Sequence, residues 1–345
     1  MLSEMRQFRA ITSRALDKLD SGWRRLSGVP SRLFYSFYTD QSPEYKACLL
    51  VAGSGRGGTT WLAEAINYDN SYRFMFEPFY HARVPISKVF GDCQYLRPEN
   101  DDPRFLRAAE RIFSGRVRNG WVDAYNRKLR ATRRLVKDIR VNLLLGWIRA
   151  HFPEMPIVLL LRHPCAVAYS RCRSQWTTDL EATFFNQPAL VQDYLNPFLE
   201  GLKELRTAFE RHIFSWCIET YVPLMQLTSG DALITTYEDC VVSPEREFQR
   251  IFTYLNRPFH DDVLSSLGKP SSQTRRNRRS GDASPVVTGE PIIDSWQQAV
   301  DSDAVRRALE IQALFGLDQI YGSDPIPNTS AFTRFVRSSK IMGMI

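Results

Sequence analysis

The sequence predicts an α/β fold in which helices cover both faces of a parallel sheet. Short apolar runs, of the kind that form buried strands, alternate along the chain with longer segments of helical character. The first apolar run, residues 47–53, closes in glycine, and a glycine-rich loop and a helical segment follow it. A loop in that position lies at the carboxyl edge of a parallel sheet, where such folds bind their ligands.

Five segments are predicted to be strands because they are short and apolar. They span residues 47–53, 72–79, 133–140, 156–164 and 232–239. The second of them ends at Glu77-Pro78, and Pro164 is expected to open the helix that follows the fourth.

Helices are predicted from apolar periodicity and from residues that favour helix ends. They span residues 59–66, 102–115, 142–152, 200–227, 243–256 and 301–316. Asp102 is expected to cap the second of these helices and Ser243 the fifth, each with a proline in the first turn. The longest segment is expected to be broken or kinked near Pro223.

The composition narrows the class of protein but leaves its function open. The 345 residues suit one large domain or two modest ones, and a hydrophobic content of 43% can fill a sizeable core. The formal net charge of +7 fits a solvated basic surface, a site for anionic ligands, or binding to nucleic acid or an anionic membrane.

Cysteine spacing and apolar content bear on the location of the protein. The six cysteines form no CxxC pair and no cluster with zinc-ligand spacing, which indicates free thiols in a reducing compartment. No stretch reaches the roughly 18 apolar residues of a membrane span, and residues 1–28 lack the apolar core of a secretory signal. We therefore expect a cytoplasmic protein. Residues 1–45 are expected to be a partly helical basic extension that packs on its own domain or on a partner, or else touches a membrane surface.

The glycine-rich loop from Gly53 to Gly58 is typical of a loop that holds a phosphate group. Glycine lets backbone N–H groups approach an anion closely, and the N-terminus of the following helix adds partial positive charge. A nucleoside-triphosphate P-loop with this GxxxxG spacing would continue with Lys and then Ser or Thr, whereas this chain has Thr59 and Thr60. The missing lysine argues against an ATPase or a GTPase, and Arg56 inside the loop is the candidate cation. A glycine turn with no chemical role is the alternative.

A second cationic segment lies at the predicted strand 156–164. Arg162 stands near the end of this strand, and Ser170 stands eight residues later on the next predicted helix. There the arginine points into the ligand cleft and the serine can reach the same phosphate group. An arginine fork suits a dianionic phosphate that no Mg²⁺ neutralises. The alternative is a helix-start arginine in an unrelated salt bridge.

Together these segments resemble the donor site of the sulfotransferases that use 3′-phosphoadenosine-5′-phosphosulfate (PAPS). The 5′-phosphosulfate loop of that family corresponds here to Arg56, Gly57, Gly58, Thr59, Thr60 and Trp61, and its 3′-phosphate segment to Arg162 and Ser170. The arginine in the loop and the Phe-Glu-Pro segment at 76–78 are similar to the carbohydrate sulfotransferase branch. The resemblance covers roughly residues 47–320 and implies a three-layer sandwich like that of the P-loop nucleotide hydrolases.

The resemblance also implies roles for individual residues. Glu77 is expected to be the base that takes the acceptor proton, with a pKa raised toward neutrality by burial, and His81 is a rival. Arg56 and the hydroxyls and amides after it are expected to stabilise charge on the departing phosphate. Many cytosolic members carry Arg-Lys-Gly-x-x-Gly near the C-terminus, where this chain has a basic loop, so we expect one arginine of this loop to contact the nucleotide. The candidates are Arg275, Arg276, Arg278 and Arg279.

Other polar and aromatic residues are expected to support the site or the core. Lys137 and Arg140 either line the acceptor side or hold the cleft together, and Asp138 is either a second acid or their partner. Three tryptophans are expected in the core rather than as platforms for a sugar, namely Trp176, Trp216 and Trp296.

We therefore expect a sulfotransferase domain over residues 46–323, with the extension 1–45 before it and a tail, 324–345, after it. Its predicted reaction moves a sulfuryl group from PAPS to an acceptor hydroxyl on a carbohydrate or glycoconjugate and leaves 3′,5′-adenosine bisphosphate (PAP). A lipid, a small metabolite, an amine or a tyrosyl peptide is an alternative acceptor. We expect no metal and no nucleic-acid partner. Two other functions stay open: a Mg²⁺-dependent P-loop kinase or NTPase, and a non-catalytic protein that binds polyanions through its basic surface.

Overall fold

Five parallel strands form the central sheet, in the order β3-β5-β2-β6-β7. The strands are β2 (Cys48–Gly53), β3 (Arg73–Phe76), β5 (Arg134–Asp138), β6 (Ile157–Leu161) and β7 (Leu233–Thr236). The structure, a computed structural model, describes residues 39–128, 130–228, 230–274, 293–328, 330–332 and 335. The predicted parallel sheet is confirmed, and each strand lies within a segment that the apolar runs predicted.

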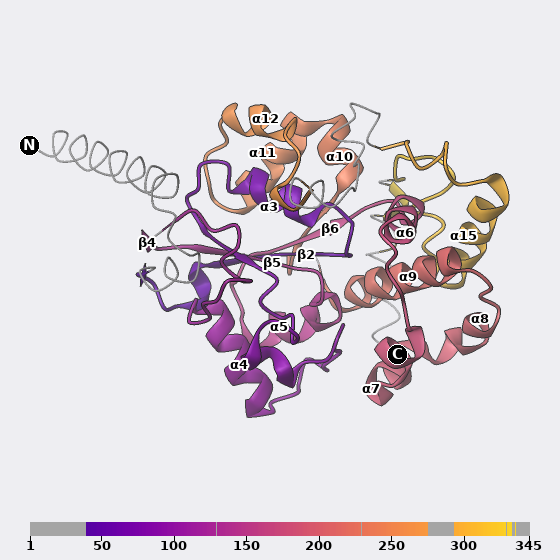
Figure 1. The fold of residues 1–345 in the computed structure, drawn as a ribbon, viewed down its shortest axis with the longest axis horizontal. Helices are drawn as coiled ribbons and strands as arrows, with labels where there is room; N and C mark the ends of the chain where they lie inside the picture. The colour runs from indigo at the N-terminus through magenta and orange to yellow at the C-terminus, as the bar shows by residue number, and fades with distance from the viewer. Residues whose placement is uncertain are drawn as a thin grey trace, which may run out of the picture.

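Burial of both faces of the sheet explains why its strands read as continuous apolar runs. Side chains of β2 alternate between two hydrophobic cores, with Leu49 and Val51 in one and Leu50 and Ala52 in the other. The first core lies under helices α3 (Thr59–Ile66), α10 (Tyr237–Val242), α11 (Pro244–Tyr254) and α12 (Asp262–Leu267). The second core lies under α4 (Pro103–Phe113), α5 (Leu145–His151), α6 (Pro164–Arg173), α9 (Ala208–Gln226) and α15 (Ser302–Leu314). Figure 1 shows α3 and α10–α12 on one side of the sheet and α4 and α5 on the other.

Shorter helical pieces connect these elements. The short α-helices are α7 (Pro188–Leu190) and α8 (Leu199–Lys203), and the π turns are η4 (Glu181–Phe185) and η5 (Val191–Leu195). The 3₁₀ turns are η1 (Tyr45–Ala47), η2 (Pro85–Val89), η3 (Asn142–Leu144) and η6 (Asn196–Phe198). Among the residues that the structure describes, no helix combines the length and the apolar character needed to span a membrane.

Two predicted elements end differently from the expectation. The last strand stops at Thr236, because the Thr236 side chain accepts the backbone N–H of Asp239 at 3.1 Å and so caps α10. The long helical segment breaks between α8 and α9, at residues 204–207, and Pro223 lies inside α9. A proline at this position leaves the Glu219 carbonyl without its helical donor, and Asn142 Nδ2 donates to that carbonyl at 3.0 Å instead.

Residues near both ends of the described chain pack on the domain. Strand β1 (Thr39–Asp40) pairs with β4 (Arg130–Ala131). Towards the other end, Ala331 is buried. Residues 1–38 of the predicted extension and 336–345 of the predicted tail lie outside the described residues.

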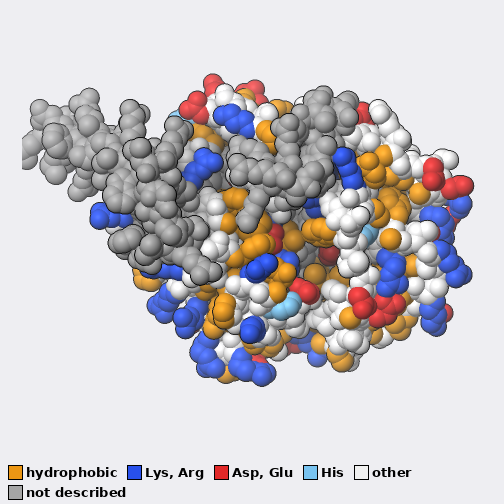
Figure 2. All heavy atoms as spheres, in the orientation of Figure 1, with side chains coloured by type: hydrophobic (Ala, Val, Ile, Leu, Met, Phe, Trp, Pro, Cys, Tyr) orange, Lys and Arg blue, Asp and Glu red, His pale blue; other side chains and the backbone are white. Residues whose placement is uncertain are grey.

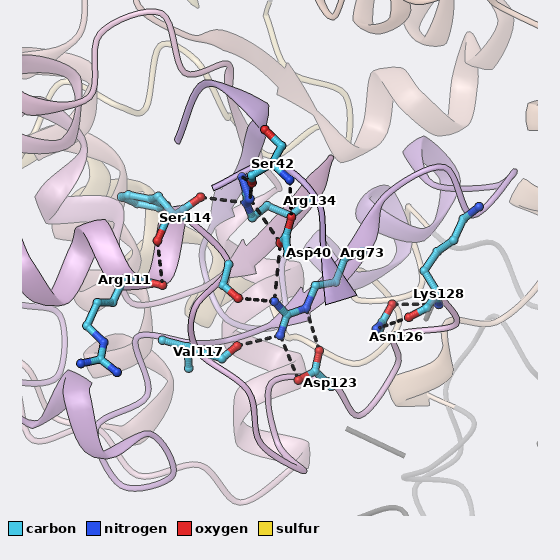
Figure 3. Close-up of polar contacts among 12 residues, drawn as sticks. Asp40, Ser42, Arg73, Arg111, Ser114, Val117, Asp123, Asn126, Lys128 and Arg134 are labelled. Atoms are coloured by element: carbon cyan, nitrogen blue, oxygen red, sulfur yellow. Dashed lines mark hydrogen bonds and ion pairs between the residues drawn. The ribbon is translucent and has the colours of Figure 1, made fainter. Parts of the chain in front are cut away.

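Two buried arginines occupy the amino end of the sheet (Figure 3). Arg73 opens β3 and Arg134 opens β5, and each is 0% exposed. Arg73 Nε lies 2.9 Å from Asp123 Oδ1, and Arg134 Nη1 lies 3.2 Å from Asp40 Oδ2. Both guanidinium groups also donate to backbone carbonyls, namely those of Ser42, Glu44, Phe113, Gly115 and Val117. These contacts join β1 and the segment after α4 to the sheet.

Candidate active site

A cavity opens at the carboxyl edge of the sheet, beside the glycine-rich loop, the ends of β3, β5 and β6, and helix α6. Most of the residues predicted from the sequence line it, namely Arg56, Gly58, Thr59, Thr60, Trp61, Glu77, Arg162 and Ser170. Figure 2 shows this face of the molecule hollowed, with hydrophobic and charged side chains mixed around the hollow. The candidates Arg275, Arg276, Arg278 and Arg279 lie outside the described residues.

The backbone of the glycine-rich loop is bent into an unusual conformation. Arg56 and Gly58 have positive φ angles, 73° and 96°. A Cβ atom at Gly58 would lie 2.7 Å from the Tyr237 ring, so this position needs glycine both for its backbone and for its neighbour. Arg56 holds the left-handed conformation although it is not glycine, and such residues cluster at functional sites. Helix α3 begins directly afterwards at Thr59, so its first N–H groups adjoin the loop.

The two predicted phosphate-binding segments meet in the structure. Arg56 Nε donates to Ser170 Oγ at 2.9 Å, and Arg162 Nη1 donates to the Arg56 carbonyl at 3.3 Å. The Arg162 guanidinium also lies over the Tyr237 ring, 4.3 Å from its centroid. Arg56 and Ser170 are 114 positions apart in the chain, so the sheet topology brings these groups together.

Aromatic and polar side chains of α3 and its neighbours form another part of the lining. The rings of Trp61 and Tyr237 meet edge to face, with centroids 5.2 Å apart. Trp61 Nε1 donates to the Leu267 carbonyl at 3.0 Å, and Thr60 Oγ1 donates to Gln273 Oε1 at 2.9 Å. These bonds fix the first turn of α3 against the segment that precedes residue 275.

Glu77 lies in the cavity wall between two cations. It follows β3, has a φ of 44° and is 3% exposed. Lys137 Nζ donates to Glu77 Oε1 at 2.6 Å, and Arg140 Nη1 donates to Oε2 at 2.9 Å. Burial by itself favours the neutral acid, but Lys137 and Arg140 outweigh it and hold the pKa of Glu77 below its ordinary value of 4.5. The predicted rise toward neutrality is therefore wrong, because it ignored the cations that β5 and its following residues place beside the carboxylate.

The other acid and base considered for the reaction have contacts of their own. Asp138 is buried and accepts the N–H groups of Phe79 and Arg140 at 2.8 and 2.9 Å, and burial raises its pKa to about 6. His81 Nδ1 lies 3.5 Å from Asp92 Oδ1, and His81 is not part of the described lining. The described part of the chain gathers no group of three His, Cys, Asp or Glu side chains that could hold a metal ion.

The sequence reasoning missed or misjudged some lining residues. It favours Tyr237 as support for the sheet edge rather than as a substrate contact, yet Tyr237 directly follows the last strand and lines the cavity. Arg173 lines the cavity three residues after Ser170 on α6, so both lie on one face of that helix. Trp176 was expected in the core, but it is 39% exposed and lines the cavity. Trp216 and Trp296 are buried as predicted, although Trp296 also reaches the cavity.

The profile of the sulfotransferase family matches residues 49–261, which include the loop, Glu77, Arg162 and Ser170. The chain belongs to the sulfotransferase family. Membership confirms the predicted family and, with it, the predicted enzyme class, a sulfotransferase. The parallel sheet between two helical layers confirms the predicted fold class.

Solved structures that are similar to this sulfotransferase share little sequence with it. The sulfotransferase domain from the curacin biosynthetic pathway is 16% identical, with a TM-score of 0.40, and the alignment covers 87% of this chain and 98% of that one. Mouse sulfotransferase SULT7A1, solved in complex with PAP, is 15% identical, with a TM-score of 0.38 and coverage of 89% and 93%. A retinol dehydratase solved with retinol and PAP is 17% identical, with a TM-score of 0.39 and coverage of 82% and 83%. No curated protein matches the chain by sequence.

Proposed function

We propose that this sulfotransferase binds PAPS in the cavity at the carboxyl edge of the sheet and transfers the sulfuryl group to an acceptor hydroxyl beside Glu77. The observation that carries the proposal is the meeting of the two segments that are predicted to bind phosphate. Arg56 contacts Ser170 at 2.9 Å, and Arg162 contacts the Arg56 carbonyl at 3.3 Å. The three residues reach one cavity from the loop after β2, from the end of β6 and from α6.

The charge of the lining supports an anionic donor. Among the lining residues that the structure describes, the cationic ones are Arg56, Lys137, Arg162 and Arg173, and Glu77 is the one carboxylate. PAPS carries a phosphosulfate at one end and a 3′-phosphate at the other, so it needs cationic groups at two places. We assign the phosphosulfate to residues 53–60 and the 3′-phosphate to Arg162 and Ser170. One of the four arginines between residues 275 and 279 remains our candidate for a further contact with the nucleotide.

Sulfuryl transfer depends on the positions of donor and acceptor and on charge stabilisation more than on covalent catalysis by the protein. Sulfuryl transfer, like phosphoryl transfer, needs the acceptor in line with the donor. In our proposal the Glu77 carboxylate takes the acceptor proton, and its lowered pKa keeps it ionised at neutral pH. Negative charge that gathers on the departing 5′-phosphate is stabilised by Arg56, by the hydroxyls of Thr59 and Thr60 and by the amides at the start of α3.

We propose a carbohydrate or glycoconjugate hydroxyl as the acceptor. The Phe-Glu-Pro segment at 76–78 and the arginine in the loop favour it. Trp176 adds an exposed aromatic face at the cavity, against which the apolar face of a sugar ring can pack. The domain limits 46–323, the cytoplasmic location and the membrane contact of residues 1–45 stay predictions from the sequence.

Calorimetric titration of the full chain with PAP in the absence of Mg²⁺ tests the donor site. We expect a Kd on the order of micromolar for PAP. ATP should bind weakly with or without Mg²⁺, because the loop lacks the P-loop lysine. Binding of Mg-ATP without binding of PAP would identify a kinase or NTPase instead. Binding of neither, with strongly salt-dependent binding of polyanions, would identify the non-catalytic alternative.

A further inference from the structure

Arg171 contacts the backbone of the glycine-rich loop from the interior of the protein. It lies on α6, is 3% exposed and is not part of the described cavity lining. Its Nε donates to the carbonyl of Gly55 at 3.1 Å. The preceding residue, Ser170, accepts the side chain of Arg56 at 2.9 Å. Two consecutive residues of α6 therefore contact two consecutive residues of the loop. Ser170 contacts the side chain of Arg56, and Arg171 contacts the backbone of Gly55.

Three successive carbonyl groups of the loop accept hydrogen bonds from the protein. The Ser54 carbonyl accepts Gly57 N–H at 2.9 Å, the Gly55 carbonyl accepts Arg171 Nε at 3.1 Å, and the Arg56 carbonyl accepts Arg162 Nη1 at 3.3 Å. A carbonyl oxygen carries partial negative charge and repels a bound anion. Protein donors that hold these oxygens fix the peptide planes, and with them the direction in which the loop presents its N–H groups.

We infer that Arg171 is a positioning residue for the 5′-phosphosulfate of the donor: it holds the Gly55 peptide so that its carbonyl is turned away from the bound anion. This inference rests on the proposed donor site. Arg171 acts through the loop backbone and has no contact with the substrate. Loss of Arg171 is therefore expected to weaken the binding of the 5′ end of the donor. Binding of the 3′ end, which is assigned to Arg162 and Ser170, should be unaffected.

Helix α9 holds the guanidinium of Arg171 in the orientation that this role needs. Arg171 Nη2 lies 2.7 Å from Glu219 Oε2, and Nη1 donates to Ser215 Oγ at 3.3 Å. Ser215 Oγ in turn donates to Glu219 Oε1 at 2.8 Å. The planar fork of an arginine reaches the carboxylate, the hydroxyl and the Gly55 carbonyl from one rigid group, and a lysine ammonium cannot reproduce that geometry.

The substitution Arg171→Lys tests the inference because it keeps the charge and removes the fork. Calorimetric titrations of the full chain with 5′-AMP and with 3′-AMP separate the two ends of the donor site. We expect the affinity for 5′-AMP to fall about tenfold and the affinity for 3′-AMP to change by less than about twofold. An unchanged affinity for 5′-AMP, or an equal loss for both nucleotides, would overturn the inference.

Arg134→Lys is the matched control, because Arg134 is equally buried and also binds backbone carbonyls, but at the amino edge of the sheet. A general effect of a buried arginine-to-lysine change would lower the affinity in both variants, whereas we expect the control to bind both nucleotides like the wild type. If Arg171→Lys does not fold, Glu219→Gln and Ser215→Ala are expected to show the same selective loss of 5′-AMP, about threefold. Wild-type binding of 5′-AMP by both would overturn the inference. A wild-type chain that binds neither nucleotide would instead contradict the proposed donor site.

Discussion

Arginines occupy both edges of the central sheet, and their surroundings differ at the two edges. At the amino edge, Arg73 and Arg134 are the first residues of β3 and β5 and are fully buried (Figure 3). At the carboxyl edge, Arg56 and Arg162 lie beyond the ends of β2 and β6, are partly buried and line the cavity. All four arginines stand beside apolar runs in the sequence. In a parallel sheet, an arginine at the start of an apolar run lies at the amino edge, away from the ligand. An arginine beyond the end of such a run lies at the carboxyl edge, where ligands bind.

The balance of charge also differs between the amino edge and the carboxyl edge of the sheet. Asp123 and Asp40 neutralise the two arginines at the amino edge, at 2.9 and 3.2 Å. The described lining of the cavity holds four cationic side chains and one carboxylate, which leaves it suited to an anion. Loss of an arginine should therefore lower stability at the amino edge and ligand affinity at the carboxyl edge.

The largest effect is expected from Arg73→Ala. This change leaves Asp123 buried without its partner, so we expect the free energy of unfolding to fall by about 3–5 kcal/mol. Urea denaturation measures it. Arg56→Ala is the comparison variant: it should lose PAP binding and keep its free energy of unfolding within about 1 kcal/mol of the wild type. If Arg56→Ala proves as unstable as Arg73→Ala, the distinction between the two edges fails.

The substitution Glu77→Gln tests whether the carboxylate at the carboxyl edge takes the acceptor proton. Without a carboxylate to take the acceptor proton, turnover of PAPS with a glycan acceptor should fall on the order of 10²-fold. The Kd for PAP should change by less than about twofold, because the donor phosphates are assigned to other residues. His81→Gln is the control, since His81 lies outside the described lining and should not affect turnover. Loss of turnover in the His81 variant and not in the Glu77 variant would reverse their roles.

Arg162→Ala separates the two ends of the donor. Arg162 is assigned to the 3′-phosphate, so the affinity for PAP should fall about tenfold. Because Arg162 also holds the Arg56 carbonyl of the loop, the affinity for 5′-AMP should fall as well, but only about threefold. Calorimetric titrations with both ligands measure the difference. Equal weakening of the two would place Arg162 away from the 3′-phosphate.

The smallest expected effect is on the pH dependence of the free energy of unfolding. The pKa of Glu77 lies below its ordinary value of 4.5 in the folded protein. A carboxylate with a lowered pKa contributes stability that is fully present above the unfolded pKa and is lost as pH falls through the folded pKa. The stability difference between wild type and Glu77→Gln should therefore be constant above about pH 6 and shrink below about pH 4.5. Urea denaturation at a series of pH values measures it, and a difference that grows toward acid would contradict the ion pairs described here.

Local sequence patterns predicted the strands and singled out the two segments, around Arg56 and Arg162, that meet at the cavity. Strands β2 and β6 are uninterrupted apolar runs. Arg162 directly follows β6, and Ser170 lies on the next helix, α6. Strand β7 was predicted too long because Tyr237 suits a strand by propensity, whereas the hydroxyl of Thr236 caps α10 and the helix begins at Tyr237.

Local sequence patterns could not predict contacts between residues that lie far apart in the chain. The pKa of Glu77 depends on Lys137, which is 60 positions away and stands opposite Phe76 in the pairing of β3 with β5. Arg171 depends on Gly55 and Glu219, which are 116 and 48 positions away. No local pattern shows such pairs, because the packing of strands and helices creates them.

The position of PAP in a crystal structure of the complex tests the central claim most directly. We predict that the 3′-phosphate lies within hydrogen-bond distance of Arg162 and Ser170. The 5′-phosphate should lie against Arg56 and the loop amides that lead into α3. PAP bound elsewhere, for example in another cavity, which residues 43–46, 110, 114 and 116 line, would contradict the assignment of the carboxyl edge as the donor site.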